Sequence, residues 1–297
     1  MKIVMPRAAE IVASNVPETD APEWEAKAYT IGAKVMVSTT HHLYQALRAT
    51  LDTENPPDHL LGTDPAWSDL GATNRFQMLD EFINTATSVT GLLDVTLTAG
   101  RCDSVGLFGC RGKTLTMDLI SGGTVIWTQT VPLLAPTYTF TEYCFSDRQF
   151  VRDVFASIPI RGSSQLRIRI DAGEGGSAQC GIAVLGMAAT LGETLWDVSP
   201  SRVSFSKKNT DDFGRTSLKK GPLAKYLKFT TSITTQEIDY VQKRLDAIDG
   251  IPCIFVAYGE TGFQPEALLV YGFATQLQPT LPNEVCSTVS FEVEGLI

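Results

Sequence analysis

The feature of this sequence that most constrains its fold is a series of short segments in which apolar and polar residues alternate. Clear cases lie at residues 93–97, 115–119 and 166–170, and shorter ones at 125–127 and 138–140. A period of two places successive side chains on opposite faces, which indicates half-buried β-strands and not helices. The segments recur about every 10 residues, so a β-sandwich of the jelly-roll kind is predicted. A Ser-Gly-Gly sequence at 121–123 predicts a tight hairpin turn.

Composition extends this expectation to the whole chain. Its 297 residues are 43% hydrophobic, enough to bury more than one core, and only 19% charged with 24 glycines, which does not favour long helices. The predicted fold class is therefore mainly β. The expected parts are an N-terminal arm with an edge strand (1–21), a small β-meander module (22–71), a junction (72–89), a β-sandwich (90–198) and an α+β domain (199–297).

The C-terminal part is expected to place one helix on a small sheet. Thr234 and Glu237 have the spacing of a capping box, in which each side chain satisfies an amide at a helix start. One apolar face follows, and Gly250 and Pro252 predict the helix end. The residues of that face are Ile238, Val241, Leu245 and Ile248. The strands expected beside the helix span residues 254–258, 268–271 and 290–296, with a turn at 259–265.

Charge is distributed unevenly along the chain. The formal net charge of −9 argues against a general nucleic-acid binder, because neutralising phosphates needs an excess of Lys and Arg. Residues 202–228 nevertheless carry eight Lys or Arg against two Asp, whereas residues 1–90 carry six against twelve Asp or Glu. These opposed segments are either two solvated faces or surfaces that meet, within one molecule or between subunits.

The cysteines and the hydropathy pattern indicate the cellular setting. Neither a secretory leader nor an apolar stretch of about 18 residues is recognisable, so membrane insertion is not expected. The six cysteines are widely spaced and lack a C-x-x-C pair, and several lie in apolar alternating runs. They are predicted to be reduced core residues of a protein made in the cytoplasm, and neither a metal nor a cofactor is expected.

Residues 22–71 are rich in aromatic residues and turn signals, and a three-stranded meander with a small aromatic core is predicted there. A helix at 41–51 is the competing interpretation, because Leu43, Leu47 and Leu51 are spaced by four. The segment resembles the small chitin- and cellulose-binding modules of bacterial glycosidases, which favours strands. The residues that carry this resemblance are Trp24, Tyr29, Gly32, Val35, Tyr44, Gln45, Ala46, Asn55, Pro56 and Trp67.

That resemblance implies sugar-stacking aromatic side chains. Within the module the candidates are Trp24, Tyr29, Tyr44 and Trp67, although a place in the small core is favoured over a sugar contact for each of them. Residues 47–50, where the related modules present adjacent exposed aromatics, are Leu-Arg-Ala-Thr in this chain. A module that makes protein contacts in place of sugar contacts is therefore an alternative.

The sequence from Trp67 to Asp80 resembles the Trp-x-x-x-Gly-x-x-Asn-Arg-x-x-Met-x-Asp junction of tail and baseplate-associated proteins encoded by phages and prophages. Asn74 and Arg75 stand beside apolar residues there, so both are expected to bond backbone carbonyls and fix the module to the next domain. The C-terminal Phe-Glu-Val-Glu-Gly-Leu also resembles the end of phage tail proteins.

These resemblances imply a non-enzymatic structural and binding component of a phage tail or baseplate, located in the virion. The partners expected for it are other tail or baseplate proteins, further copies of itself and a host-surface polysaccharide. One alternative is a glycan depolymerase or cell-wall hydrolase that carries a targeting module, which requires two close carboxylates within residues 90–297. A purely structural connector is the other alternative.

Other catalytic patterns fit poorly, and catalytic and metal-binding residues are not expected. Residues 106–114 resemble a phosphate-binding loop, but the first glycine is one residue too far from Gly112-Lys113-Thr114, and residues 114–120 alternate like a strand where a helix would be required. A catalytic triad is disfavoured because the three histidines lie together in the module and no Gly-x-Ser-x-Gly sequence occurs. His41 and His42 would point to opposite faces of a strand and so could not bind one metal ion.

Overall fold

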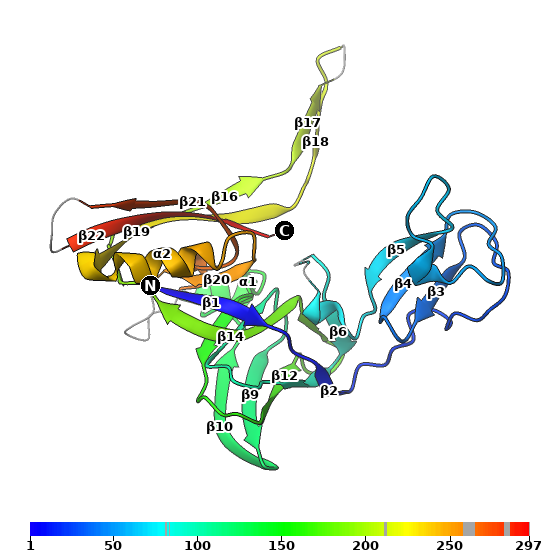
Figure 1. Cartoon of the computed structure of the whole chain (residues 1–297), viewed down its shortest axis with the longest axis horizontal. Coiled ribbons are helices and arrows are strands. Elements are labelled where there is room, and N and C mark those ends of the chain that lie inside the picture. The colour runs from blue at the N-terminus through cyan, green and yellow to red at the C-terminus, as the bar shows by residue number, and fades with distance from the viewer. Residues whose placement is uncertain (81, 83, 211–212, 258–264, 282–285, 297) are drawn as a thin grey trace.

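A computed structural model describes the chain except for residues 81, 83, 211–212, 258–264, 282–285 and 297, and the side chains of residues 276–277. The fold is mainly β, with 50% of residues in strands and 10% in helices, which confirms the predicted class (Figure 1). Among the described residues, none of the helices has both the length and the apolar character needed to cross a membrane.

A sheet of ten strands forms the centre of the molecule. Its order is β11-β8-β14-β1-β20-β21-β22-β19-β15, and β16 pairs with the other half of β19. The bounds of the first five are Val154–Ser157 (β11), Ser104–Phe108 (β8), Ile182–Thr190 (β14), Lys2–Arg7 (β1) and Cys253–Val256 (β20). The remaining five are Leu269–Thr280 (β21), Cys286–Gly295 (β22), Leu223–Thr234 (β19), Glu193–Thr194 (β15) and Ser199–Ser204 (β16).

This sheet curls into a half-barrel, and its concave face is apolar. Phe108 and Val184 from one end of the sheet share a core with Ile254 and Tyr271 from strands further along it. Gly106 in β8 makes this approach possible, because a Cβ at that position would overlap the side chain of Ile254.

Residues 106–114 belong to strands and a connection, and residues 114–121 form a strand as predicted, so the segment is not a phosphate-binding loop.

The predicted sandwich is formed by a second sheet that packs on the convex face of β8 and β14. Its order is β10-β9-β12-β7-β2, and inward residues such as Leu97, Met117 and Ile168 are fully buried against Leu107 and Leu185 of the large sheet. The bounds are Thr124–Pro132 (β10), Thr114–Ser121 (β9), Ser164–Asp171 (β12), Leu92–Thr98 (β7) and Ile11–Ser14 (β2). The turn at 121–123 joins β9 to β10 as expected, with both glycines at positive φ. A small pair, Thr87–Thr90 (β6) and Ser177–Cys180 (β13), lies beside it.

The C-terminal helix forms where the capping box predicts. A 3-10 turn (Thr235–Glu237) leads into α2 (Ile238–Asp246), and Thr234 and Glu237 cap each other's amides. Val241, Leu245 and Ile248 are buried against the strands β19 to β22. The sheet beneath this helix is not a separate small sheet, because it continues through β20 and β1 into the strands of the sandwich.

The N-terminal strand differs most from expectation. Residues 2–7 were predicted to be an edge strand or arm, yet β1 pairs with β14 along its whole length and with β20 at its start. Pro6 is tolerated because the pairing with β20 covers only Lys2 to Val4. A single strand thus joins the sandwich half of the sheet to the helix-bearing half (Figure 1).

The segment 138–140 was also predicted wrongly. In place of a strand, a short helix, α1 (Phe140–Phe145), begins after Thr139, whose side chain accepts a hydrogen bond from the amide of Glu142.

Four of the six thiols lie in the core as predicted, but Cys144 is exposed on α1 and Cys286 is half-buried. Burial raises the pKa of Cys253 to about 12, so this thiol is unreactive near neutral pH.

The N-terminal module is the predicted three-stranded meander, and the competing helix at 41–51 does not form. Its strands are Lys34–Val37 (β3), His42–Ala46 (β4) and Trp67–Ala72 (β5), in the order β3-β4-β5. The module stands apart from the body of the molecule in Figure 1. Further turns of 3-10 helix lie at Pro56–Asp58, Gln77–Leu79 and Glu266–Leu268.

Two arginines on β12 each pair with an aspartate on a different neighbouring strand. Arg167 donates to Asp94 of β7 at 2.5 and 2.8 Å, and Arg169 donates to Asp118 of β9 at 2.6 Å. The hydrogen bonds from Arg167 lower the pKa of Asp94. The pKa of Asp94 is therefore lower in the folded state than in the unfolded state, where it is near 4. The ionised carboxylate stabilises the fold when the pH is above about 4, and this stabilisation is lost as the pH falls below that value.

Replacing Asp94 by asparagine is therefore expected to lower the free energy of unfolding by about 1–2 kcal/mol at neutral pH. The difference between the variant and the wild type should shrink as the pH falls from 5 toward 3, because protonation then weakens the wild-type contact. Urea unfolding at several pH values measures this. Asp147→Asn, at an exposed position, is the control; a pH-independent difference at position 94 would contradict the assignment.

Candidate assembly surface

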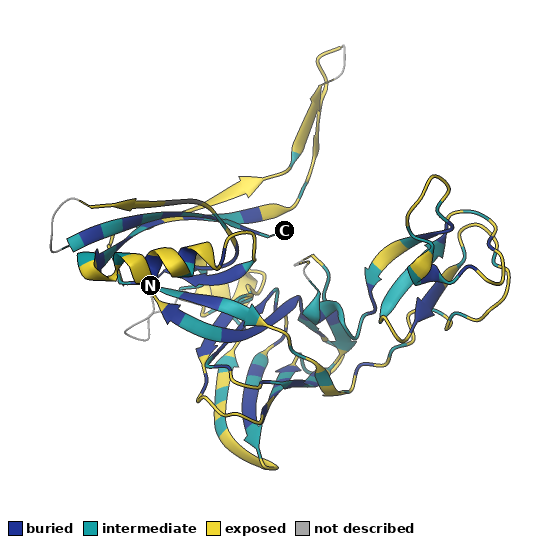
Figure 2. Ribbon diagram, viewed as in Figure 1, coloured by how far each residue is buried: buried dark blue, intermediate teal, exposed yellow. Residues whose placement is uncertain are grey.

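A two-stranded hairpin without a core projects from the large sheet. It consists of Lys207–Thr210 (β17) and Thr216–Lys219 (β18), which pair only with each other, and every described residue of both strands is exposed (Figures 1 and 2). We call residues 205–210 and 213–221 the basic hairpin. An isolated two-stranded hairpin is at best marginally stable in water, so a surface of this kind is typical of a segment that docks on a partner.

The base of the basic hairpin is nevertheless well defined. The amide of Gly221 donates to Oγ of Ser206 at 3.0 Å, and the amide of Phe205 donates to the carbonyl of Pro222 at 3.1 Å. Gly221 has no room for a Cβ because the carbonyl of Phe205 occupies that space. These contacts fix the direction in which the hairpin leaves β16 and β19.

Apolar side chains accompany the lysines on and beside the hairpin. Leu218 is 74% exposed, and Val203, Phe205 and Leu223 near its base are exposed as well. A second exposed apolar group surrounds α1 on the sandwich and contains Tyr138, Phe140, Tyr143 and Phe145. Exposed aromatic clusters mark contact surfaces. The alternation in the sequence had assigned Tyr138 and Phe140 to a strand.

The four aromatic candidates for sugar stacking all contribute to the core of the module. Tyr44 and Trp67 are buried, with 3% and 1% of their surface exposed, whereas Trp24 and Tyr29 are half-buried and pack against them. Nε1 of Trp67 donates to the carbonyl of Glu54 at 2.9 Å, and the ring of Tyr29 meets Trp67 edge-on at 5.4 Å. The four residues are thus brought together as a packed cluster.

An ion cluster holds the loops of the module in place. Arg48 donates to both oxygens of Glu54 at 2.6 and 3.0 Å and lies 3.0 Å from Asp64. The hydrogen bonds from Arg48 and the amide of Leu51 lower the pKa of Glu54 to about 2. The ion cluster therefore orders the loops that follow β4 together with the packing of Leu60 on the apolar core of the module.

Asn74 makes the contact that the sequence predicts for the junction. Its Nδ2 donates to the carbonyl of Ser88 in β6 at 3.0 Å, and the amide of Ser88 donates back to Oδ1 at 2.9 Å. The prediction for Arg75 is not matched among the described residues, where its buried Nε lacks a hydrogen-bond partner. Asn74 therefore ties the chain leaving the module to the body.

A second contact at the junction was not predicted. Glu18 accepts a hydrogen bond from the buried Thr73 at 2.9 Å and lies 2.9 Å from Nδ1 of His41, whose ring stacks on Phe76 at 3.7 Å. His41 has a φ of 56°, so it occupies a turn before β4, while His42 in β4 bonds to Asp69 at 2.8 Å. Both chain segments that connect the module to the body are thus held side by side.

One pair of close carboxylates does occur in the C-terminal two thirds of the chain. Asp153 and Glu266 lie on either side of Lys225, which forms an ion pair with Asp153 and is 3.9 Å from Glu266. Lys225 also donates to the carbonyl of Glu266 at 2.9 Å, and the amide of Gly109 donates to Asp153 at 3.1 Å. Burial raises the pKa of Glu266, and the negative charge of Asp153 raises it further.

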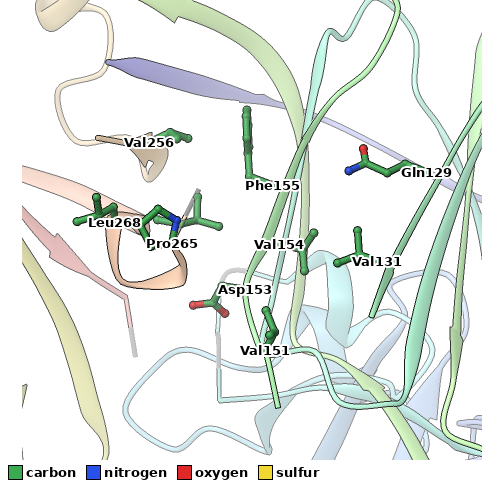
Figure 3. A pocket seen from close by; sticks show the side chains of 10 residues that line it. Gln129, Val131, Val151, Asp153, Val154, Phe155, Val256, Pro265 and Leu268 are labelled. Atoms are coloured by element: carbon green, nitrogen blue, oxygen red, sulfur yellow. The ribbon is translucent and has the colours of Figure 1, made fainter. Parts of the chain in front are cut away.

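A pocket of about 170 Å³ adjoins Asp153 (Figure 3). Its lining is mostly aliphatic, with Val154, Phe155 and Leu268 around it and Gln129 on one side. This volume is below the range of about 300–1,000 Å³ that is usual for small-molecule sites. Both oxygens of Asp153 are engaged, one by Lys225 and one by the amide of Gly109, so the cluster joins the two halves of the large sheet.

Comparison with known proteins gives no assignment. No protein-family model matches the chain. No curated protein and no solved structure is significantly similar to it.

Proposed function

We propose that this chain is a non-enzymatic structural subunit of a phage tail or baseplate, which assembles with its own copies and with other tail proteins through its β-rich body. The basic hairpin carries this proposal, because a two-stranded segment with fully exposed side chains needs a partner to be stable. The junction sequence around Asn74 and the exposed aromatic group at α1 support the same class of protein.

The role that we propose for the N-terminal module is a connector that makes protein contacts. Tyr44 and Trp67 are used in its core, and the stretch at 47–50 lacks aromatic side chains. Contact with a host-surface glycan would depend on the exposed parts of Trp24 and Tyr29. The hydrolase alternative is weaker, because the carboxylate pair Asp153 and Glu266 is joined to a lysine.

Particle composition tests the proposal. Particles purified from cells that encode the chain are expected to contain it in many copies, measured by quantitative mass spectrometry across a density gradient. An unrelated host protein of similar abundance is the control for contamination. A chain found only in the particle-free lysate would contradict the proposal and favour a released enzyme.

A further inference from the structure

The register of the basic hairpin places like charges opposite each other. Lys207 pairs directly with Lys219, and on the other face Lys208 pairs with Leu218. Directly opposite residues of an antiparallel pair have their side chains close together, so two lysines there repel each other. This arrangement is unfavourable in the free chain and becomes favourable when an anionic surface lies against it.

None of the four lysines of the hairpin forms an ion pair within the part of the chain that the structure describes. Lys207, Lys208, Lys219 and Lys220 are exposed, and the salt bridges among described residues involve none of them. By contrast, Lys225 and Lys228 on the adjoining strand β19 are each paired with a carboxylate. The unpaired positive charge is therefore concentrated on the projecting segment.

The N-terminal module carries the complementary charge. Residues 22–71 contain seven Asp or Glu and three Lys or Arg, the largest acidic excess of the five expected parts of the chain. Its loops at residues 47–65, which we call the acidic loop surface, expose Asp52, Asp58 and Asp64, the last of which also pairs with Arg48. Leu51 and Leu61 belong to the same loops, with 63% and 92% of their surface exposed. The acidic loop surface therefore offers both charge and apolar area.

We propose that the basic hairpin of one copy docks on the acidic loop surface of a second copy of this chain. Lys207 and Lys219, which share one face of the hairpin, meet the three aspartates. Within one copy, the hairpin and the module are separate projections of the body (Figure 1), so the complementary surfaces are free for a neighbour. This inference rests on the proposed function and names its partner.

Such a contact joins two different surfaces and is therefore heterologous. Heterologous contacts repeat from copy to copy and produce rings when the rotation closes and filaments when it does not. The contact would also bury the unpaired lysines of the hairpin. A structural subunit of a multi-copy assembly would gain its polymerising contact in this way.

Carbodiimide coupling of the purified full chain tests the contact, because this reagent joins a lysine to a carboxylate only when they touch. A mixture of isotopically light and heavy copies distinguishes links between copies from links within one copy. We expect mixed-isotope links from Lys207, Lys208, Lys219 or Lys220 to Asp52, Asp58 or Asp64. Links within a single copy, links to other surfaces or no links from the hairpin would each overturn the proposal.

Charge exchange gives a second, independent readout. The variant Lys207→Glu with Lys219→Glu keeps a like-charged pair across the hairpin, so the hairpin's own stability changes little. We expect this variant, and separately Asp52→Lys with Asp58→Lys, to weaken self-association at least about tenfold. Combining all four changes should restore it. Arg101→Glu with Arg161→Glu, at exposed sandwich positions, alters net charge equally and should have no effect.

The outcomes separate this inference from the proposed function. Unchanged association of the hairpin variant, or no recovery in the combined variant, would overturn the hairpin–module contact even if the chain is present in particles. Retention of the wild type, but not the hairpin variant, on immobilised DNA at physiological salt would assign the hairpin to nucleic acid and overturn it as well. Absence from particles would overturn only the proposed function.

Discussion

Replacing Lys225 by methionine is expected to lower the free energy of unfolding by about 3 kcal/mol at neutral pH. Lys225 is the cation between two carboxylates, Asp153 and Glu266, and Asp153 retains only 11% of its side-chain exposure. Removing the cation leaves two like charges close together at the contact between the sandwich and the helix-bearing half. Methionine keeps most of the side-chain volume, so the loss reports charge and not packing.

Lys228 on the same strand provides the matched control. Its side chain is 60% exposed and pairs with Glu292 at 2.5 Å, so Lys228→Met should cost less than about 1 kcal/mol. Because the pKa of Glu266 is already raised, this group binds a proton more readily in the folded state than in the unfolded one. Lowering the pH from 7 to 5 should therefore return part of the stability lost in Lys225→Met. Urea unfolding at both pH values measures this, and equal losses at 225 and 228 would refute the role given to Lys225.

Replacing Val4 by aspartate should be more damaging, with a loss of at least about 4 kcal/mol. Val4 is fully buried in β1, where it packs on the concave face with Ile254 and Val184. The substitution removes apolar contacts and places an unpaired charge in the strand that joins both halves of the large sheet. Since small domains have about 5–15 kcal/mol of stability in total, a large part of the molecule is expected to lose its fixed structure.

Val12→Asp in β2 is the control, because Val12 is 48% exposed and its replacement should change stability by no more than about 0.5 kcal/mol. Circular dichroism in a urea series measures both variants. Gly186→Val offers a second test of the same strand, since a Cβ at Gly186 would overlap the carbonyl of Met5 and prevent pairing of β1 with β14. Wild-type stability in both Val4→Asp and Gly186→Val would show that β1 is dispensable.

The strands and the longer helix could be predicted because their signals are local. Alternation identified the strands at 92–98, 114–121 and 164–171, and the capping box at Thr234 identified the helix start. The same signal is present at Thr139 and Glu142 but was not recognised, and the alternation of two aromatic residues led to the wrong expectation of a strand. The cap geometry is the better guide there, because α1 is fully exposed and its apolar pattern reports no core.

The position of β1 could not be predicted because strand pairing is a long-range property. Lys2 to Arg7 pairs with residues more than 170 positions away, and Pro6 suggested an edge. The basic hairpin was seen only as a run of positive charge, since its strands lack the apolar face that marks a strand. For the aromatic residues of the module, a core role was favoured over a contact role, but the degree of burial of each ring depends on how the loops at 47–65 fold over them.

We propose that the chain is an assembly subunit and that its basic hairpin makes the contact between copies. Multi-angle light scattering of two forms tests it most directly: the full chain, and a variant in which residues 206–221 are replaced by Asn-Gly, so that the existing pair Phe205 and Pro222 closes a short turn. We expect oligomers of the full chain at micromolar concentration, and a monomer of unchanged unfolding midpoint for the variant. Equal masses for the two forms, whether monomeric or oligomeric, would contradict it.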